Sequence, residues 1–329
     1  MTTFDYERAD SVDDACRRIG KTAPAYAGGT DLLTLIKAGL RSPERVVDLK
    51  RSGLSDQIVD DGDLVSLGAL VTLGGIERSP VLRARLTALS EAAGQAATPQ
   101  LRHRATIGGN LLQRPRCWYF RTPEVDCWLK GGTACPARGG RNEHHAIFHD
   151  SPCVAVHPSD LAGPLVALDA LVQLRSTTGS RALPVAQLLE PPTEERRTET
   201  VLGTEEIITR IDIDTSQPVV STYRKAMDRA AWSFALVGVA IAARFDGAGL
   251  TGVRIVLSGV ANTPHQATDS EEILVRSGEL SATTIERAAA AAAADAEPLG
   301  RNGYKRQLVV ALTRDALTHV AGRRQRPGT

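Results

Sequence analysis

Four cysteines lie close together in the sequence and could bind a metal ion or a cluster. Cys117, Cys127, Cys135 and Cys153 fall within 37 residues, with the spacing C-x9-C-x7-C-x17-C. Zinc ribbons use short C-x2-C pairs, so the wider spacing argues against a conventional structural zinc site. Four thiolates in an irregular segment suit an iron–sulfur cluster. The spacing alone leaves three alternatives open: a cluster, a zinc ion, or four unrelated thiols.

The first of these cysteines stands in the run QRPRCWYFR, among arginines and aromatic side chains. A cluster with four thiolate ligands carries a net negative charge, and its potential depends on nearby charge and on solvent exposure. We therefore expect Arg114, Arg116 and Arg121 to offset that charge, and residues 118–120 to exclude water. The fifth cysteine, Cys16, lies in a segment with helical spacing, where a small buried side chain is expected.

Two short glycine-rich segments have the composition of phosphate-binding loops. AGGTDLL, residues 27–33, stands between a predicted strand and a predicted helix, and Gly28 and Gly29 allow positive φ. The helix that begins near Asp31 would add unpaired N–H donors. Taken alone, this motif fits an ordinary tight turn equally well. ATIGGN, residues 105–110, is a second loop of the same kind, and two facing loops could hold the two phosphates of a diphosphate with neutral amides.

Other motifs do not support nucleotide or hydrolase chemistry. GAGLTG, residues 247–252, matches G-x-G-x-x-G, but a strand follows where the dinucleotide fingerprint needs a helix, so we interpret it as a hairpin turn. The sequence contains no G-x-S-x-G, H-E-x-x-H or Walker pattern. No histidine is assigned to a metal, and no catalytic residue is assigned. Lys and Arg total 39 against 38 for Asp and Glu, which gives no support to a nucleic-acid or membrane partner.

The elements around these motifs predict an α+β protein in three parts. Residues 1–55 alternate short helices and strands, as in a small α/β unit. Residues 56–217 contain hairpin-like strands and helices, interrupted at about 113–153 by the irregular segment that carries the four cysteines. Residues 218–329 predict a pair of strands followed by helices. The polar, Pro-bearing residues 188–203 are predicted to be a surface excursion.

The N-terminal sequence gives an expectation about location. Residues 1–20 are acidic where a secretory signal would be basic and then apolar, and no window approaches the ~20 apolar residues of a membrane span. We therefore expect a cytoplasmic protein without a signal of its own. It would be periplasmic if it were exported with a signal-bearing partner.

Six motifs occur in order along the chain and resemble one protein family. They are AGGTDLL, GALVTL, ATIGGNLLQRPRCWYFR, HPSDLAGPLVALDA, YRKAMDRAAWSFALVGVA and SGVANTPHQA. Together they closely resemble the FAD-binding medium subunit of the molybdenum hydroxylases, the xanthine dehydrogenase and carbon monoxide dehydrogenase family. CWYFR and the three later cysteines are similar to the branch whose flavin subunit binds a 4Fe-4S cluster on an inserted loop. Periplasmic-type bacterial aldehyde oxidoreductase and 4-hydroxybenzoyl-CoA reductase belong to that branch, and the aldehyde oxidoreductase is the more similar.

The resemblance implies a fold, two cofactors and their sites. The fold is an FAD-binding domain of the vanillyl-alcohol-oxidase (PCMH) type in two α/β subdomains, followed by a C-terminal domain of antiparallel sheet with a helical bundle. The FAD diphosphate would contact Ala27, Gly28, Gly29, Thr30, Asp31, Leu32, Thr106, Gly108, Gly109 and Asn110. Positions near the adenosine or flavin would be Gln113, Ser159, Asp160 and Lys225, the last close to the isoalloxazine ring. The 4Fe-4S ligands would be Cys117, Cys127, Cys135 and Cys153.

The resemblance also implies partners and a role. In this family, substrate is oxidised at a molybdenum–pterin cofactor on a large subunit, and electrons pass through 2Fe-2S clusters on a small subunit to FAD. This chain would be the electron-transfer subunit of such a heterotrimeric oxidoreductase, passing electrons to an external acceptor. A stand-alone FAD oxidoreductase of the vanillyl-alcohol-oxidase type is the alternative, and a zinc-bearing scaffold without flavin is a third hypothesis.

Overall fold

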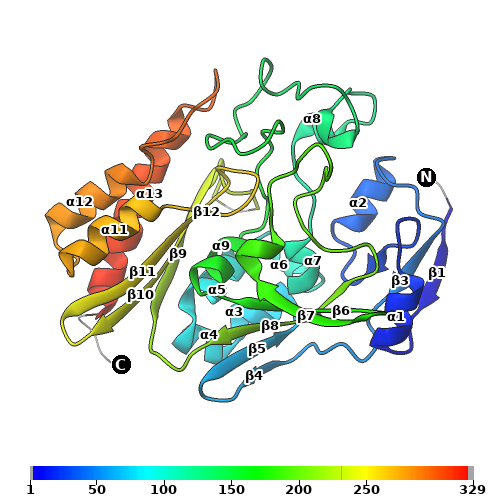
Figure 1. The fold of residues 1–329 in the computed structure, drawn as a ribbon, viewed down its shortest axis with the longest axis horizontal. Helices are drawn as coiled ribbons and strands as arrows, with labels where there is room; N and C mark the ends of the chain where they lie inside the picture. The colour runs from blue at the N-terminus through cyan, green and yellow to red at the C-terminus, as the bar shows by residue number, and fades with distance from the viewer. Residues whose placement is uncertain (1–2, 231, 325–329) are drawn as a thin grey trace.

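The computed structural model describes residues 3–230 and 232–324, which form three β-sheets with helices packed around them (Figure 1). In Figure 1 the N-terminal sheet lies at one side, the C-terminal sheet at the other, and a larger sheet below and between them. The irregular segment around α8 (Trp118–Arg121) lies at the opposite end from that larger sheet. No helix in the described ranges is both long enough and apolar enough to cross a membrane.

The N-terminal sheet is parallel and has the strand order β1-β3-β2. Its strands are β1 (Asp5–Arg8), β2 (Ala25–Tyr26) and β3 (Arg45–Asp48), and the connections contain α1 (Val12–Arg18) and α2 (Leu32–Lys37). Ser11 caps α1, because its hydroxyl accepts the Asp14 N–H at 3.0 Å. The alternation of short helices and strands predicted for this part of the chain is confirmed. Cys16 is buried in this unit, as expected.

The second sheet has five strands in the order β4-β5-β8-β6-β7, and every neighbouring pair is antiparallel. The strands are β4 (Ile58–Asp60), β5 (Leu64–Gly68), β6 (Leu171–Ser176), β7 (Gly179–Pro184) and β8 (Ile207–Asp214). Its helices are α3 (Leu73–Arg78), α4 (Pro80–Arg85), α5 (Thr87–Gln95), α6 (Pro99–Arg102), α7 (Ile107–Leu111), α9 (Ala162–Ala167) and α10 (Val185–Leu188). β5 ends at Gly68, and α3 begins at Leu73 with the Thr72 hydroxyl as its cap, which accepts the Gly75 N–H.

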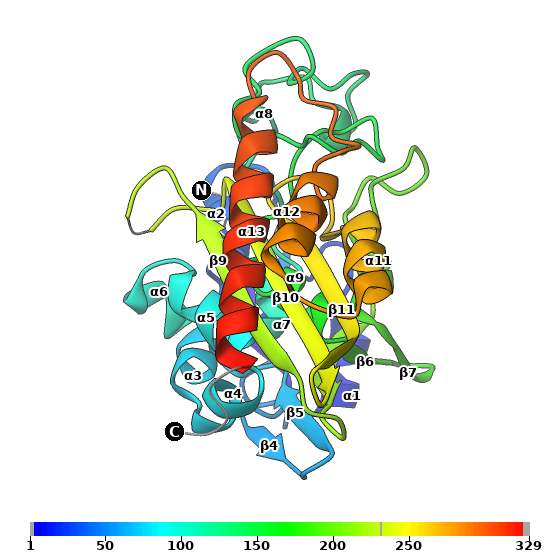
Figure 2. The same ribbon diagram turned by 90° about the vertical axis from the view of Figure 1, so that its left-hand side faces the viewer.

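The third sheet is antiparallel, with the order β12-β11-β10-β9. It consists of β9 (Val220–Ala226), β10 (Val237–Asp246), β11 (Gly249–Ser258) and β12 (His265–Gln266). Figure 2 shows α11 (Thr268–Ser277), α12 (Ala282–Ala291) and α13 (Tyr304–Arg324) over one face of this sheet. The opposite face packs on α5 and α9. Gly247, with φ of 51°, turns β10 into β11, so the prediction of a hairpin at GAGLTG is confirmed.

The cysteine-bearing segment has little regular structure, namely α8 and the 3-10 turn η1 (Trp128–Lys130). Backbone hydrogen bonds fix it to the rim of the C-terminal sheet, from Ile147 N to Val260 O at 2.8 Å and from His157 N to Ala261 O at 3.0 Å. The segment is therefore part of the packed structure and not a free loop.

Residues 188–203 lie at the surface for much of their length, as predicted, and specific contacts hold them there. The Trp128 indole donates to Glu194 at 2.9 Å, and the Arg197 guanidinium donates to the Trp128 carbonyl at 2.7 Å. Glu199 is 2% exposed. The prediction is confirmed for residues 193–195 and 198, which are exposed, whereas Glu199 is buried and the segment is tied to Trp128 about seventy residues earlier. The part boundaries at 55/56 and 217/218 stay predictions.

Candidate functional site

The first glycine loop follows β2 and leads into α2. Gly29 has φ of +71°, and a Cβ there would lie 2.5 Å from the Tyr26 ring. A Cβ on Gly28 would lie 1.9 Å from the carbonyl oxygen of Arg104, in the stretch that precedes the second glycine loop. Both positions therefore require glycine, and the contact at Gly28 brings the two loops side by side.

The backbone N–H groups differ between the two loops. In the second loop, Ile107 N donates to Val71 O at 2.8 Å and Gly108 N donates to Ala69 O at 3.1 Å. The Gly109 N–H is taken by the Thr106 hydroxyl that caps α7. In the first loop, the N–H groups of residues 28–32 have no acceptor within the described ranges. Unpaired N–H groups are thus found in the first loop, whereas both loops were expected to carry them.

A cavity of ≈ 390 Å³ runs along both loops. The predicted FAD residues that line it are Ala27, Gly28, Gly29, Thr30, Asp31, Leu32, Thr106, Gly108 and Gly109. Its remaining walls contain residues that sequence reasoning missed, including Lys21, Arg41, Leu202 and Ile207. These residues come from separate elements, and no motif around them in the sequence indicates that they line a cavity. A concave site with unpaired N–H groups at one side and apolar side chains at the other fits a nucleotide diphosphate.

Asp31 joins the first loop to the cysteine-bearing segment. Its Oδ2 accepts the Arg114 N–H at 2.8 Å, and its Oδ1 lies 2.6 Å from Arg116 and 2.9 Å from Arg121. The Asp31 side chain makes no capping bond to α2. Arg116 and Arg121 therefore share one carboxylate from the first glycine loop, and their expected effect on a cluster charge stays a prediction.

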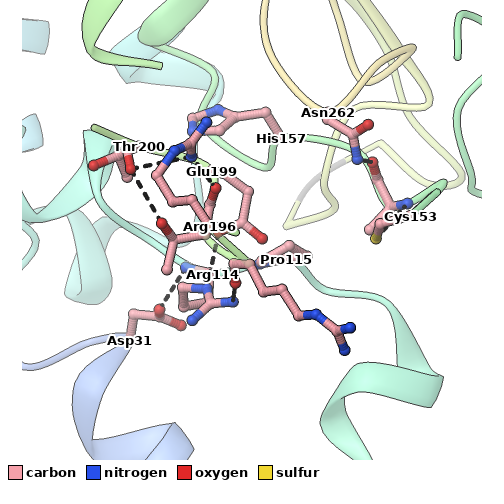
Figure 3. A network of polar contacts seen from close by, with 12 residues as sticks. Asp31, Arg114, Pro115, Cys153, His157, Arg196, Glu199, Thr200 and Asn262 are labelled. Carbon is pink, nitrogen blue, oxygen red and sulfur yellow. Dashed lines mark hydrogen bonds and ion pairs between the residues drawn. The ribbon is translucent and has the colours of Figure 1, made fainter. Parts of the chain in front are cut away.

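Arg114 is also paired, with Glu199 (Figure 3). Arg114 Nε lies 2.9 Å from Glu199 Oε2, and the Arg114 side chain packs over the Phe120 ring at 4.9 Å. Burial raises the pKa of Glu199, and the Arg114 charge opposes that shift. Figure 3 shows Asp31 and Glu199 on either side of Arg114, so all three arginines of the expected set are held by carboxylates.

Ser159, Asp160 and Lys225 meet at a second place in the fold. The Ser159 hydroxyl donates to the Asn110 side chain at 2.6 Å, which ties the HPSD turn to α7. Lys225 Nζ donates to Asp160 at 2.8 Å, to Ser233 O at 2.9 Å and to the Gln95 carbonyl at 3.1 Å, so its three donors are all used within the protein.

The carboxylate of Asp160 has a second partner that sequence reasoning missed. The Tyr223 hydroxyl donates to Asp160 Oδ1 at 2.9 Å. Burial raises the pKa of Asp160, while Lys225 and Tyr223 oppose that shift. Tyr223 is itself fully buried. The pair formed by Asp160 and Lys225 is therefore a buried ion pair with its hydrogen bonds satisfied.

A second cavity, of ≈ 200 Å³, connects this region with the cysteines. Cys117, Trp118 and His145 line it at one side, and Ser159 and Asp160 at the other. Gln113 lies outside both cavities and donates to the Asn110 carbonyl at 2.9 Å. The structure thus brings predicted flavin residues and one predicted cluster ligand to the same hollow.

The four clustered cysteines are all free thiols in a largely apolar setting. Cys117, Cys127 and Cys153 pack with Phe120, Trp128 and Leu129, whereas Cys135 packs beside Tyr119 and Val154. Cys153 hydrogen-bonds to Cys135 through sulfur. Cys117 in turn lies within electrostatic range of Cys127 and Cys135.

Backbone N–H groups are directed at each of the four sulfurs. Ala155 N donates to Cys153 Sγ at 3.4 Å, and the N–H groups two residues after the other three cysteines, at Tyr119, Leu129 and Ala137, lie near enough to lower the pKa of those thiols. Phe120 and Lys130 add a second donor at Cys117 and Cys127. Donors of this kind stabilise thiolates, the form in which cysteine binds a metal.

Without a cation, this set of thiols resists ionisation. Burial raises the pKa of Cys117 to about 11 and also raises the pKa of Cys127. The hydrogen bond from Cys153 lowers the pKa of Cys135 to about 6, and the same bond raises the pKa of Cys153. The pKa is therefore raised for three of the four thiols, which disfavours their thiolate forms. Within residues 3–230 and 232–324, no three His, Cys, Asp or Glu side chains are close enough to hold a metal ion as they stand.

Comparison with known proteins decides the family. Residues 2–215 match the FAD binding domain in molybdopterin dehydrogenase, and residues 221–320 match the CO dehydrogenase flavoprotein C-terminal domain. The chain belongs to the FAD-binding medium subunits of the molybdenum hydroxylases. The family resemblance and the fold class expected from the sequence are confirmed.

Individual relatives of this medium subunit cover nearly its whole length. The aldehyde oxidoreductase FAD-binding subunit PaoB of Escherichia coli is 33% identical over 93% of this chain and 94% of its own. The glyceraldehyde dehydrogenase medium chain of Sulfolobus acidocaldarius is 24% identical over 97% and 98%. The CO dehydrogenase structure from Oligotropha carboxidovorans superposes with a TM-score of 0.76 at 25% identity, covering 98% of each chain.

Family membership explains the flavin site, but several polar residues at the site were missed in the sequence analysis. His145, Glu199 and Tyr223 were not singled out from the sequence. Each is nearly or completely buried, and its partner lies at least 28 residues away in the chain. The adjacent His144 and His145 gave the one available signal, a histidine pair inside the cysteine segment.

Proposed function

We propose that this chain is the FAD- and 4Fe-4S-binding electron-transfer subunit of a heterotrimeric molybdenum oxidoreductase that acts on aldehydes. One observation carries the proposal of two redox centres: the cavity that Cys117 lines is also lined by Ser159 and Asp160, which are predicted to lie near the adenosine or flavin of FAD. Two redox centres in one chain would then lie on either side of a small cavity. This arrangement suits electron transfer and not substrate binding.

FAD fits the first cavity on the chemistry of its walls. The unpaired N–H groups of residues 28–32 would hold the diphosphate, and Leu202 and Ile207 would contact the adenosine. When bound, FAD supplies a group that accepts electrons singly or in pairs. The protein's own part is to keep Gly28 against the second loop and to exclude water from the hollow beside Asp160.

The four cysteines fit an iron–sulfur cluster better than they fit unrelated thiols. Nearby backbone N–H groups favour the thiolate form of each cysteine, and the surrounding side chains are largely apolar. Four buried thiols become thiolates together only when a cation offsets their charge. A zinc ion would use the same donors, so metal analysis has to separate these two outcomes.

The partners and the substrate class are inferred from the relatives. Relatives named as medium chains or FAD-binding subunits cover almost the full length of this chain, which supports a large molybdopterin-binding subunit and a small 2Fe-2S subunit as partners. Two of these relatives carry aldehyde chemistry in their names, aldehyde oxidoreductase and glyceraldehyde dehydrogenase. We therefore expect an aldehyde as the electron source, oxidised on the large subunit.

The test is cofactor analysis of the complex, co-expressed with its neighbouring subunits and purified anaerobically. We expect about one FAD and about four irons per medium subunit, beyond the irons of the small subunit. Cys153→Ser should remove most of that iron and keep the FAD, whereas Cys16→Ser, at a buried thiol far from the segment, should change neither. Stoichiometric zinc without iron would overturn the cluster, and absence of FAD would overturn the whole proposal.

A second experiment tests the role in electron transfer. An aldehyde added under anaerobic conditions should bleach the flavin absorption of the complete complex and leave the isolated medium subunit unchanged. Bleaching of the isolated chain by an aldehyde would instead establish a stand-alone flavin oxidoreductase.

A further inference from the structure

We propose that His145 is a positioning residue for the iron–sulfur cluster, donating its Nε2–H to the sulfur of Cys117 and thereby raising the reduction potential of the cluster. The inference rests on the proposed function, in which Cys117 is a cluster ligand. His145 Nε2 lies 3.1 Å from Cys117 Sγ, although the two residues are 28 positions apart.

The imidazole of His145 is fixed on several sides. The side chain is 2% exposed, and its ring stands edge-on to the Trp118 ring, with centroids 5.4 Å apart and planes at 73°. The Asn302 side chain donates to the His145 carbonyl at 3.1 Å, and His145 N donates to Asn142 O at 3.1 Å. Because the backbone and the Trp118 ring hold the imidazole in place, Nε2 stays beside the sulfur and little side-chain entropy is lost when the hydrogen bond forms.

The chemistry of the two atoms sets the direction of the hydrogen bond. A sulfur that binds iron is a thiolate and can only accept, so the proton must lie on Nε2. The opposite nitrogen, Nδ1, is buried and has no hydrogen-bond partner in the described ranges. The neutral tautomer with Nε2–H therefore satisfies the sulfur and places no second N–H in the buried, unpartnered position.

A donor at this sulfur has a defined electronic effect. Reduction adds one negative charge to a cluster, and an N–H directed at a ligand sulfur stabilises the reduced form more than the oxidised form. The backbone N–H groups of Tyr119 and Phe120 lower the pKa of Cys117, and His145 is the side-chain donor within hydrogen-bond distance of its sulfur. Because Cys117 and His145 also line the cavity shared with Asp160, the hydrogen bond lies on the side of the segment that faces the predicted flavin residues.

The test compares His145 with its neighbour. His144 also stands edge-on to Trp118, at 5.7 Å, but its Nδ1 lies 3.7 Å from Asp228 Oδ2 and its side chain is 47% exposed. Variants His145→Leu, His145→Gln and His144→Leu are prepared in the complete complex. The midpoint potential of the cluster is measured by redox titration followed by electron paramagnetic resonance.

We expect His145→Leu to lower the midpoint potential, with iron and FAD contents unchanged. His145→Gln places an amide N–H near the position of Nε2 and should restore most of the wild-type value. His144→Leu should titrate as the wild type does. Equal potentials for His145→Leu and the wild type, both with full iron content, would overturn the role of His145 and leave the cluster intact.

A measurement on the wild type keeps the inference testable where His145→Leu fails to assemble a cluster. Electron-nuclear double resonance of the reduced cluster, in protein labelled with ¹⁵N-histidine, should show a weak ¹⁵N coupling and an exchangeable proton. The absence of any histidine coupling would overturn the inference, as would a strong coupling that makes His145 a ligand. A wild-type complex without iron would instead overturn the proposed function on which the inference rests.

Discussion

Arg121 donates to Asp31 Oδ1 at 2.9 Å across 90 residues of sequence. The same guanidinium group donates to the Pro115 carbonyl at 2.8 Å and to the Arg114 carbonyl at 2.9 Å. One side chain therefore closes the turn that leads into α8 and fastens it to the first glycine loop. The geometry of the predicted cluster segment and that of the predicted diphosphate loop are coupled through this contact.

Removal of the Asp31 carboxylate should loosen both loops. In Asp31→Ala, Arg116 and Arg121 lose a shared partner while remaining largely buried, and we expect a loss of about 3 kcal/mol in the free energy of unfolding. Urea unfolding of the flavin-free chain, together with FAD content, measures the effect. Glu272→Ala removes an exposed i,i+4 pair with Arg276 and should cost less than about 0.5 kcal/mol. Equal losses in the two variants would contradict the coupling.

A methyl group at Gly28 should separate the two glycine loops. Because the new Cβ would lie 1.9 Å from the Arg104 carbonyl oxygen, Gly28→Ala must displace backbone, and we expect at least a roughly tenfold loss of FAD affinity. Equilibrium binding of FAD to the stripped chain measures it. Gly20→Ala is the control, since Gly20 also lines the cavity but nothing lies within 4 Å of its added Cβ. If Gly28→Ala bound FAD as tightly as Gly20→Ala, the first cavity would not be the diphosphate site.

The buried pair of Lys225 and Asp160 should depend strongly on both partners. Lys225→Met leaves the Asp160 carboxylate without its cation, and we expect a loss of about 3–5 kcal/mol in the free energy of unfolding. The double variant Lys225→Met with Asp160→Leu should recover part of that loss, because no buried charge is left. Urea unfolding of the three proteins tests this, and a double variant less stable than the single one would refute it.

Lys305 should give the protein a pH-dependent stability. Its side chain is fully buried at the start of α13, its Nζ donates to the Gly259 carbonyl at 2.7 Å, and burial lowers its pKa from 10.5 to about 7. Between these two values the unfolded chain binds the proton that the folded chain has released, so stability rises with pH through this window. The contribution is about 1.4 kcal/mol for each pH unit.

Lys305→Met should abolish this contribution. The difference in unfolding free energy between wild type and variant should grow in favour of the wild type from pH 7 to pH 10 and be constant below about pH 6. Chemical unfolding at a series of pH values measures this difference, and Lys37→Met, at an exposed position, should show no such trend. A flat difference for Lys305→Met would refute the depressed pKa.

Much of the site was predictable because its signals are local. Glycines at 28 and 29, a threonine cap at Thr106 and the alternation of strands and helices around them follow from φ preferences and capping, which act within a few residues. The hairpin at GAGLTG was predictable for the same reason. The six ordered motifs added the family and hence the cofactor.

The partners of the charged residues were not predictable in this way. The sequence suggested that Arg114, Arg116 and Arg121 act on the cluster because they surround Cys117, yet Asp31 and Glu199 hold them. Residues 188–203 look like a polar surface segment, yet Glu199 within them is buried and pairs with Arg114. A polar side chain gives no local sign of its partner, because that partner comes from a distant part of the chain.

The sequence by itself determined the family, the fold class, the glycine loops and the set of four cysteines, since each is written in residue type and short spacing. Only the tertiary structure decided that Asp31 binds the cysteine segment, that Lys225 donates its hydrogen bonds to groups of the protein, and that His145 faces Cys117. These contacts span 28 to 90 residues of sequence. They form because the packing of three sheets brings distant elements together, and a buried polar group is stable there when another polar group hydrogen-bonds to it.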